Sequence, residues 1–131
     1  MSKRLGDAIE LRGFDLQRSD PKPGASVPRL TLHWQAIAVP AEDYTVFVQL
    51  LDGDGRPVAQ ADSEPAAGRW PTSYWESGDR ITDTHELKLD QGLPPGRYSI
   101  VAGMYLAATG QRLVAEDGQD YIRLGEVSIG P

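Results

Sequence analysis

Hydrophobic and polar residues alternate with a period of two along much of this chain. Between residues 30 and 36 every even position is apolar and every odd position is polar, which predicts a strand with one buried face. Residues 45–51 and 98–105 are apolar on both faces, a pattern that is typical of central strands. Strand-like patterns also occur over 9–16, 56–61, 81–89, 111–115, 121–124 and 126–129, with a bulge expected at Gly13.

Turn signals separate these segments, and no amphipathic helix pattern accompanies them. Fourteen Gly and ten Pro supply the turns, and short helical turns are expected only at 38–43 and 64–73. A chain of 131 residues fits one domain, residues 1–131, whose ordered core we expect over about 8–129. We therefore predict an all-β, antiparallel β-sandwich of about seven to nine strands, of immunoglobulin-like or jelly-roll type.

Composition removes several classes of partner. The net charge of −6 offers no basic excess for a nucleic acid or an anionic membrane surface. The absence of Cys excludes disulfides and thiolate metal sites. No apolar run approaches the roughly 18 residues of a membrane span, so direct membrane insertion is not expected. The first residues, MSKRLGDAIEL, have no apolar stretch, so we expect no signal peptide in this chain.

The segment 69–79, RWPTSYWESGD, gathers three of the ten aromatic residues of the chain. Flat rings beside charged side chains are what a sugar face and its hydroxyls require, so Arg69, Trp70, Tyr74 and Trp75 are the candidate ligand-binding residues. A structural role competes with this function for Trp75, which stands just before a turn into a strand. There its ring would seal the end of the sandwich, with the indole N–H bonded to a carbonyl. Trp70 is the ring most expected to meet solvent.

Other chemistry-bearing residues have plainer explanations. The run Asp52-Gly53-Asp54-Gly55 resembles the start of a calcium loop but lacks the distal Glu, so a hairpin turn is expected. The acidic turn 116–120 could hold Ca²⁺ beside a neighbouring loop, although we predict neither a metal site nor a cofactor. His33 should face outward, and His85 should be partly buried and bonded to a neighbour on the apolar face that it shares with Asp83.

Catalysis is not expected. The chain has no GxSxG elbow, Cys-His pair, HExxH motif or phosphate loop. Nineteen carboxylates leave room for a glycosidase-like acid and base pair, but each is explained as a turn or surface residue. We therefore predict a protein that is not an enzyme.

An ordered set of motifs resembles a known bacterial domain. The motifs are PGASVPRLTLHWQA, DYTVFVQLLDGDGRPVAQADSEP, RWPTSYWESGD, THELKLDQGLPPGRYSIVAGMY and ATGQRL. Together they are similar to the soluble β-sandwich that follows the membrane-embedded part of large glycosyltransferases of the protein-mannosyltransferase-like family. The resemblance implies a non-catalytic accessory module, extracytoplasmic if the chain is part of a larger membrane protein. It brings no established ligand, so the partners to consider are a glycan and the parent protein's membrane domain.

A second hypothesis belongs to a different class. The domain could be a structural spacer or a docking surface for another protein, with no small-molecule ligand. The apolar outer positions Phe47, Leu51, Val101 and Tyr105 suggest it, because an apolar second face of a sheet needs something to cover it. The exposure of these positions separates the two hypotheses.

Overall fold

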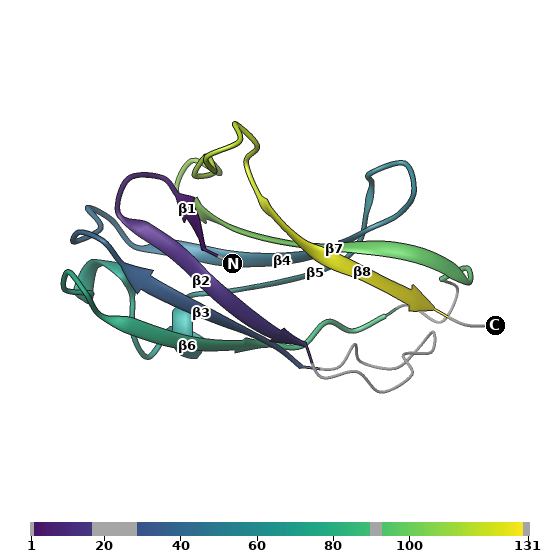
Figure 1. Ribbon diagram of the computed structural model, residues 1–131, viewed down its shortest axis with the longest axis horizontal. Coiled ribbons are helices and arrows are strands. Elements are labelled where there is room, and N and C mark those ends of the chain that lie inside the picture. The colour runs from purple at the N-terminus through teal and green to yellow at the C-terminus, as the bar shows by residue number, and fades with distance from the viewer. Residues whose placement is uncertain (1, 17–28, 90–92, 130–131) are drawn as a thin grey trace.

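The computed structural model describes residues 2–16, 29–89 and 93–129, and these contain eight strands and two short 3₁₀ helices (Figure 1). The expected core of 8–129 includes 17–28 and 90–92, which lie outside the described residues. The strands are β1 Lys3–Leu5, β2 Ile9–Leu16, β3 Leu30–Ala36, β4 Tyr44–Leu51, β5 Pro57–Ser63, β6 Arg80–His85, β7 Gly96–Leu106 and β8 Ile122–Ile129, and the helices are η1 Pro65–Gly68 and η2 Thr72–Tyr74.

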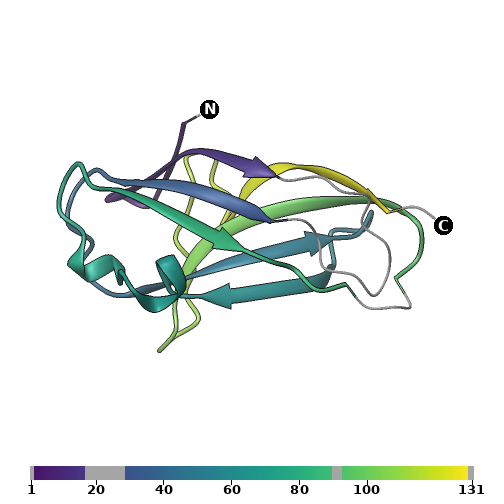
Figure 2. The same cartoon turned by 90° about the horizontal axis from the view of Figure 1, so that it is seen from below.

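The strands form two four-stranded antiparallel sheets, which confirms the prediction of an all-β sandwich. One sheet has the order β1-β2-β3-β6 and the other β5-β4-β7-β8. The two strands expected to be central, β4 and β7, are inner strands of the second sheet. Figure 2 shows the two sheets as layers, with η1 and η2 at one end.

The sheet order decides between the two expected types of sandwich. In a jelly roll, successive strands alternate between the sheets, whereas here β2 and β3 are neighbours in one sheet. The order β8-β7-β4-β5 corresponds to strands G, F, C and C′ of an immunoglobulin-type domain. A tyrosine corner agrees, because the Tyr98 hydroxyl near the start of β7 donates to the Pro94 carbonyl upstream. The described residues therefore form a β-sandwich whose strand order is like that of immunoglobulin-type domains.

Several local expectations are confirmed and others are wrong. The register of β2 on β3 shifts between Leu11 and Gly13, so the bulge at Gly13 is present. Strand β1 was not expected, and β8 is one strand where two segments were predicted. Residues 111–115 form only isolated bridges, and 38–43 contain no helical turn. β6 ends at His85, although Leu87 and Leu89 beyond it are still buried.

The core lies between the sheets and follows the alternation. Trp34, Leu50, Ile81 and Ile100 each come from a different strand and are at most 2% exposed. Burial of such side chains stabilises the fold by about 1.5–3 kcal/mol each relative to exposure. The period of two therefore fixes which face of each strand enters the core.

The outer face of the second sheet is covered by the chain itself. Phe47 and Val101 point away from the main core, yet both are at most 1% exposed. The Arg112 guanidinium lies 4.2 Å from the centre of the Phe47 ring, and Tyr105 packs beside that ring. The Asp62 carboxylate accepts the Tyr105 hydroxyl and raises the pKa of this phenol above its ordinary value. Leu51 and Tyr105 are half-buried, so the four apolar positions that suggested a docking surface do not form an open patch.

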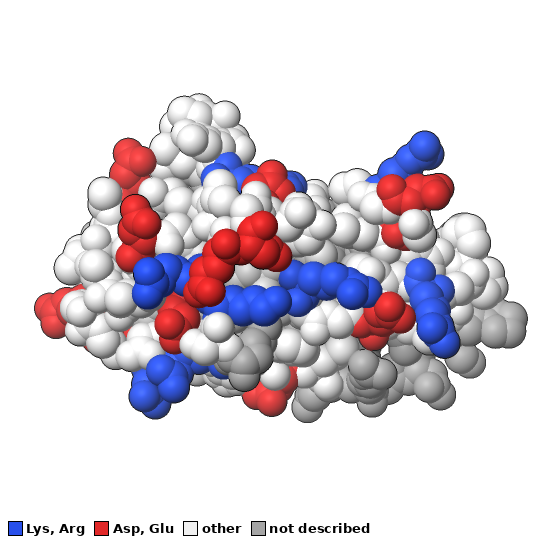
Figure 3. Space-filling view, turned by 45° about the horizontal axis from the view of Figure 1, so that its top comes forward, with Lys and Arg blue, Asp and Glu red and all other residues white. Residues whose placement is uncertain are grey.

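Charged side chains cover much of the remaining surface. Figure 3 shows acidic and basic side chains interspersed on the face in view. Several form exposed pairs, such as Arg123 with Glu126 at 3.0 Å, which contribute little to stability. Among the described residues, no helix is long and apolar enough to cross a membrane.

The Phe47 ring packs directly against Gly103 on β7, where a larger side chain would not fit. A Cβ at Gly103 would lie 2.6 Å from Phe47 Cζ, whereas a Cβ at Gly125 on β8 would meet no atom within 4 Å. We expect Gly103→Ala to lower the free energy of unfolding by about 1–3 kcal/mol because the ring must move. The matched Gly125→Ala should change it by less than about 0.5 kcal/mol. Urea unfolding checks this, and equal stability of the two variants would contradict the packing.

Candidate functional site

Three long connections meet at one end of the sandwich. Because neighbouring strands are antiparallel, the connections 37–43, 64–79 and 107–121 all leave the sheets at the end where β4 begins and β7 finishes. The first and third correspond to the B–C and F–G loops, which lie at the antigen-binding end of antibody variable domains. We call this the loop end. It contains residues 69–79, which we call the aromatic segment.

Trp75 anchors the aromatic segment in the core. Its side chain is 1% exposed, and its indole Nε1–H donates to the Trp70 carbonyl oxygen over 2.9 Å. The predicted structural role of Trp75 is therefore confirmed, including the bond to a carbonyl. A ring that is buried in this way is not available to a ligand, so Trp75 supports the segment from below.

Thr72 ties the same segment to the start of β4. Its buried hydroxyl donates to the Glu42 carbonyl over 2.6 Å and accepts the Tyr44 backbone N–H over 2.9 Å. One residue further, the Ser73 N–H donates to Asp43 Oδ1 over 3.0 Å. The side-chain and backbone hydrogen bonds from Ser73 lower the pKa of the Asp43 carboxyl, so this contact is kept to a lower pH than an isolated Asp would allow.

The other three candidate residues lie on the surface of this fixed segment. Tyr74 is 72% exposed, Trp70 is 36% exposed and Arg69 is exposed. Trp70 was the ring most expected to meet solvent, but Tyr74 is the more exposed of the two. The structure thus separates the four residues into one buried support and three surface groups.

A buried polar cluster contacts η1, the turn that precedes the aromatic segment. Asp83 on β6 is fully buried, and its Oδ2 accepts the Trp34 indole N–H over 3.2 Å and lies 2.6 Å from His85 Nε2. Its Oδ1 accepts the Ala66 backbone N–H of η1 over 3.0 Å. Ala66 and Ala67 have φ values of 54° and 56°, in the left-handed region that costs non-glycine residues about 1–2 kcal/mol each. The cluster therefore holds a strained turn against the sheet.

The expectation for His85 is confirmed, because this side chain is buried and bonded to Asp83. The sequence carried a signal for the pair, since two polar residues occupy alternate positions on the apolar face of one strand. His33 is half-buried and pairs with Asp15 on the outer face of the first sheet, at 2.7 Å. The two histidines are thus each paired with a different carboxylate.

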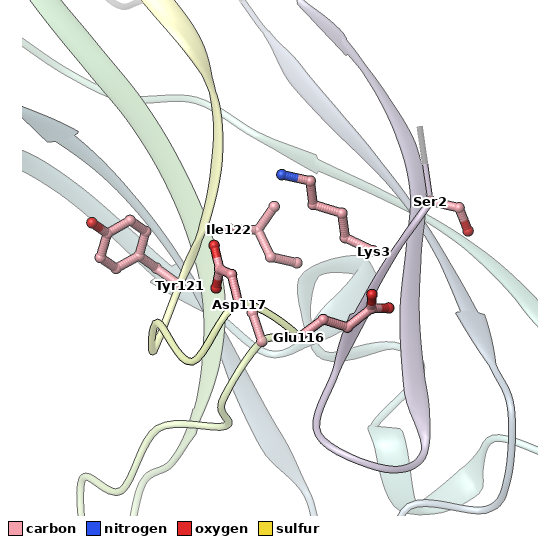
Figure 4. A pocket seen from close by; sticks show the side chains of 7 residues that line it. Ser2, Lys3, Glu116, Asp117, Tyr121 and Ile122 are labelled. Carbon is pink, nitrogen blue, oxygen red and sulfur yellow. The ribbon is translucent and has the colours of Figure 1, made fainter.

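Two pockets flank the 107–121 connection. One has a volume of about 230 Å³ and lies between β1 and the acidic turn. Figure 4 shows Lys3 and Asp117 extending toward the space over Ile122, whereas Tyr121 points away. The other is about 160 Å³ and is lined by Glu42, Tyr44, Leu106, Gln111, Arg112 and Leu113. We call the second one the end pocket.

The acidic turns have structural roles. Asp52 Oδ1 accepts the backbone N–H groups of Asp54 and Arg56, each over 2.9 Å, so the expected hairpin turn is present. In the acidic turn 116–120, Asp117 accepts the Gln119 N–H and Glu116 accepts the Arg4 N–H. Within the described ranges, no group of three or more His, Cys, Asp or Glu side chains is placed to hold a metal ion.

No protein-family model matches this chain, and no curated protein is similar enough to it to count as a relative. The geometry of the loop end offers exposed rings on a fixed segment, a neighbouring small pocket and a buried cluster that holds the preceding turn η1.

The different roles of Trp75 and Trp70 can be tested by comparing the stability of two variants. Trp75→Phe should lower the free energy of unfolding by about 2–3 kcal/mol, because it leaves the Trp70 carbonyl unpaired and opens a cavity. Trp70→Ala should cost less than about 1 kcal/mol, since its ring is partly in solvent and its carbonyl is retained. Denaturant unfolding of both variants provides the comparison. A larger loss in Trp70→Ala would overturn the assignment of Trp75 as the support.

The buried cluster also has a direct test. Asp83→Asn keeps one oxygen acceptor but replaces the other oxygen with an NH₂ group. This donor would face another donor, either the Trp34 indole N–H or the Ala66 backbone N–H. We expect a loss of about 3 kcal/mol in unfolding free energy and faster hydrogen exchange at the Ala66 amide. Asp54→Asn, at an exposed turn, is the matched control. Unchanged exchange at Ala66 in the Asp83 variant would show that the carboxylate does not hold the η1 turn.

Proposed function

We propose that this domain is a non-catalytic binding module that takes carbohydrate at its loop end. In this proposal Trp70 and Tyr74 offer their ring faces to the C–H face of a sugar, and Arg69 donates to hydroxyl groups at the edge. Trp75 acts only as the support beneath them. The observation that carries the proposal is that two exposed rings stand on one segment whose backbone is fixed.

Preorganisation is the physical reason to prefer this function. Exposed aromatic side chains on a mobile loop lose entropy when a ligand orders them, and this loss weakens binding. Here the segment is already held by the Trp75 indole, the Thr72 hydroxyl and the Asp43 carboxylate. Large rings with few rotatable bonds also give much contact area at low entropic cost. The position at the loop end agrees, by analogy of fold alone, with where antibody domains bind.

The setting of the module is part of the proposal. The sequence resemblance supports an accessory domain of a cell-envelope glycosyltransferase-like protein, extracytoplasmic in its parent. A multi-span hydrophobic region in the same reading frame is the observation that checks this setting. The docking alternative loses its supporting observation, because Phe47 and Val101 are covered by the chain's own residues.

Sugar binding is tested with a microbial glycan array, followed by NMR titration of the chain with glycans that bind. We expect chemical-shift changes at the Trp70 indole N–H and at Tyr74. Trp70→Ala should weaken binding by about fivefold or more, because stacking of one ring is worth on the order of 1 kcal/mol or more. Tyr121→Ala, beside the other pocket, is the control and should bind as the wild type does. Binding that is lost in Tyr121→Ala but kept in Trp70→Ala would place the site elsewhere.

A further inference from the structure

The end pocket and the exposed rings share one support. Glu42 and Tyr44 line the pocket, and the Thr72 hydroxyl is hydrogen-bonded to the backbone of both. Thr72 is also the first residue of η2, which ends at the exposed Tyr74. The rim of the pocket and the ring-bearing segment are therefore joined through a single buried side chain.

The opposite wall of the pocket is also fixed at its backbone. Gln111 accepts the Leu106 N–H over 2.9 Å through its carbonyl, and its own N–H donates to Thr109 Oγ1 over 3.2 Å. Gly110, at φ 75°, makes the tight turn before it. Arg112 beside it is held over the Phe47 ring and against Asp120. The pocket is thus built from two connections that the fold holds in place.

Two polar side chains that line this pocket have no partner within the part of the chain that the structure describes. They are the Glu42 carboxylate and the Gln111 amide, and only the backbone groups of these residues are used. A carboxylate can accept from two adjacent hydroxyls, and an amide can both donate and accept. The volume of about 160 Å³ is below the roughly 300–1,000 Å³ of pockets for drug-sized ligands, so it suits part of one ring.

We infer that the end pocket is a second sugar subsite, and that the module recognises neutral glycans of at least two sugar units. This inference rests on the proposed function. One sugar stacks on Trp70 and Tyr74, and the next presents adjacent hydroxyls to Glu42 and Gln111. A neutral glycan fits because the Glu42 carboxylate repels an acidic sugar, while the cation that lines the pocket, Arg112, is already paired with Asp120.

The test uses the full 131-residue chain and five probes: the neutral tetrasaccharides cellotetraose and mannotetraose, the monosaccharides glucose and mannose, and the acidic tetragalacturonate for comparison. At least one tetrasaccharide should shift both the Trp70 indole N–H and the Gln111 side-chain amide, with at least tenfold higher affinity than its monosaccharide. Gln111→Ala and Glu42→Gln should each weaken tetrasaccharide binding by about threefold to tenfold, the usual cost of one hydrogen bond. The monosaccharide shift at Trp70 should be unchanged in both variants.

Matched controls keep the outcome specific. Asp54→Asn removes the same charge at the far hairpin, and Gln119→Ala truncates a glutamine of the same connection that does not line the end pocket. Both should bind as the wild type does. If tetrasaccharides shift Trp70 and Tyr74 but bind Glu42→Gln and Gln111→Ala with full affinity, the subsite is wrong and the proposed function stands. If no array glycan and neither tetrasaccharide perturbs Trp70 or Tyr74, the proposed function fails and the subsite fails with it. Tighter binding of tetragalacturonate would overturn the preference for neutral glycans.

Discussion

The buried carboxylate of Asp83 is the constraint on which the loop end depends. A carboxylate in a core is costly unless its oxygens are satisfied, and here they meet the Trp34 indole, the His85 ring and the Ala66 amide. Two of these partners belong to the strands, while the third belongs to the turn that crosses from one sheet to the other. The strained conformation of Ala66 and Ala67 persists because the carboxylate offsets its cost.

The rest of the aromatic segment follows from this anchoring. Beyond η1, Trp75 returns to the core and Thr72 binds the start of β4, so the segment is fixed at both ends and in the middle. The 107–121 connection is fixed in a different way, by Arg112 over Phe47. The same contact covers the second sheet and positions a wall of the end pocket. Stability and the proposed recognition thus use the same side chains at this end.

The parts of the site that could be predicted are those whose contacts join residues close together in the sequence. The burial of Trp75 could be predicted because the cause is local, a ring beside a turn that leads into a strand. The polar pair Asp83 and His85 was visible as two polar residues on an apolar face. The end pocket was not visible, since Glu42 and Gln111 are distant in sequence and meet only because β4 and β7 pair.

By itself the sequence determined most of the strands and their buried faces, because side chains alternate between the two faces of a strand regardless of what covers them. It also determined the bulge at Gly13 and the all-β class. Only the tertiary structure decided the immunoglobulin-like order, the short strand β1 and the cover over Phe47 and Val101. The last of these leaves the alternative of an exposed apolar docking face without an open patch at Phe47 and Val101. Periodicity shows that a position is apolar. Contacts between distant segments decide which sheet or connection buries it.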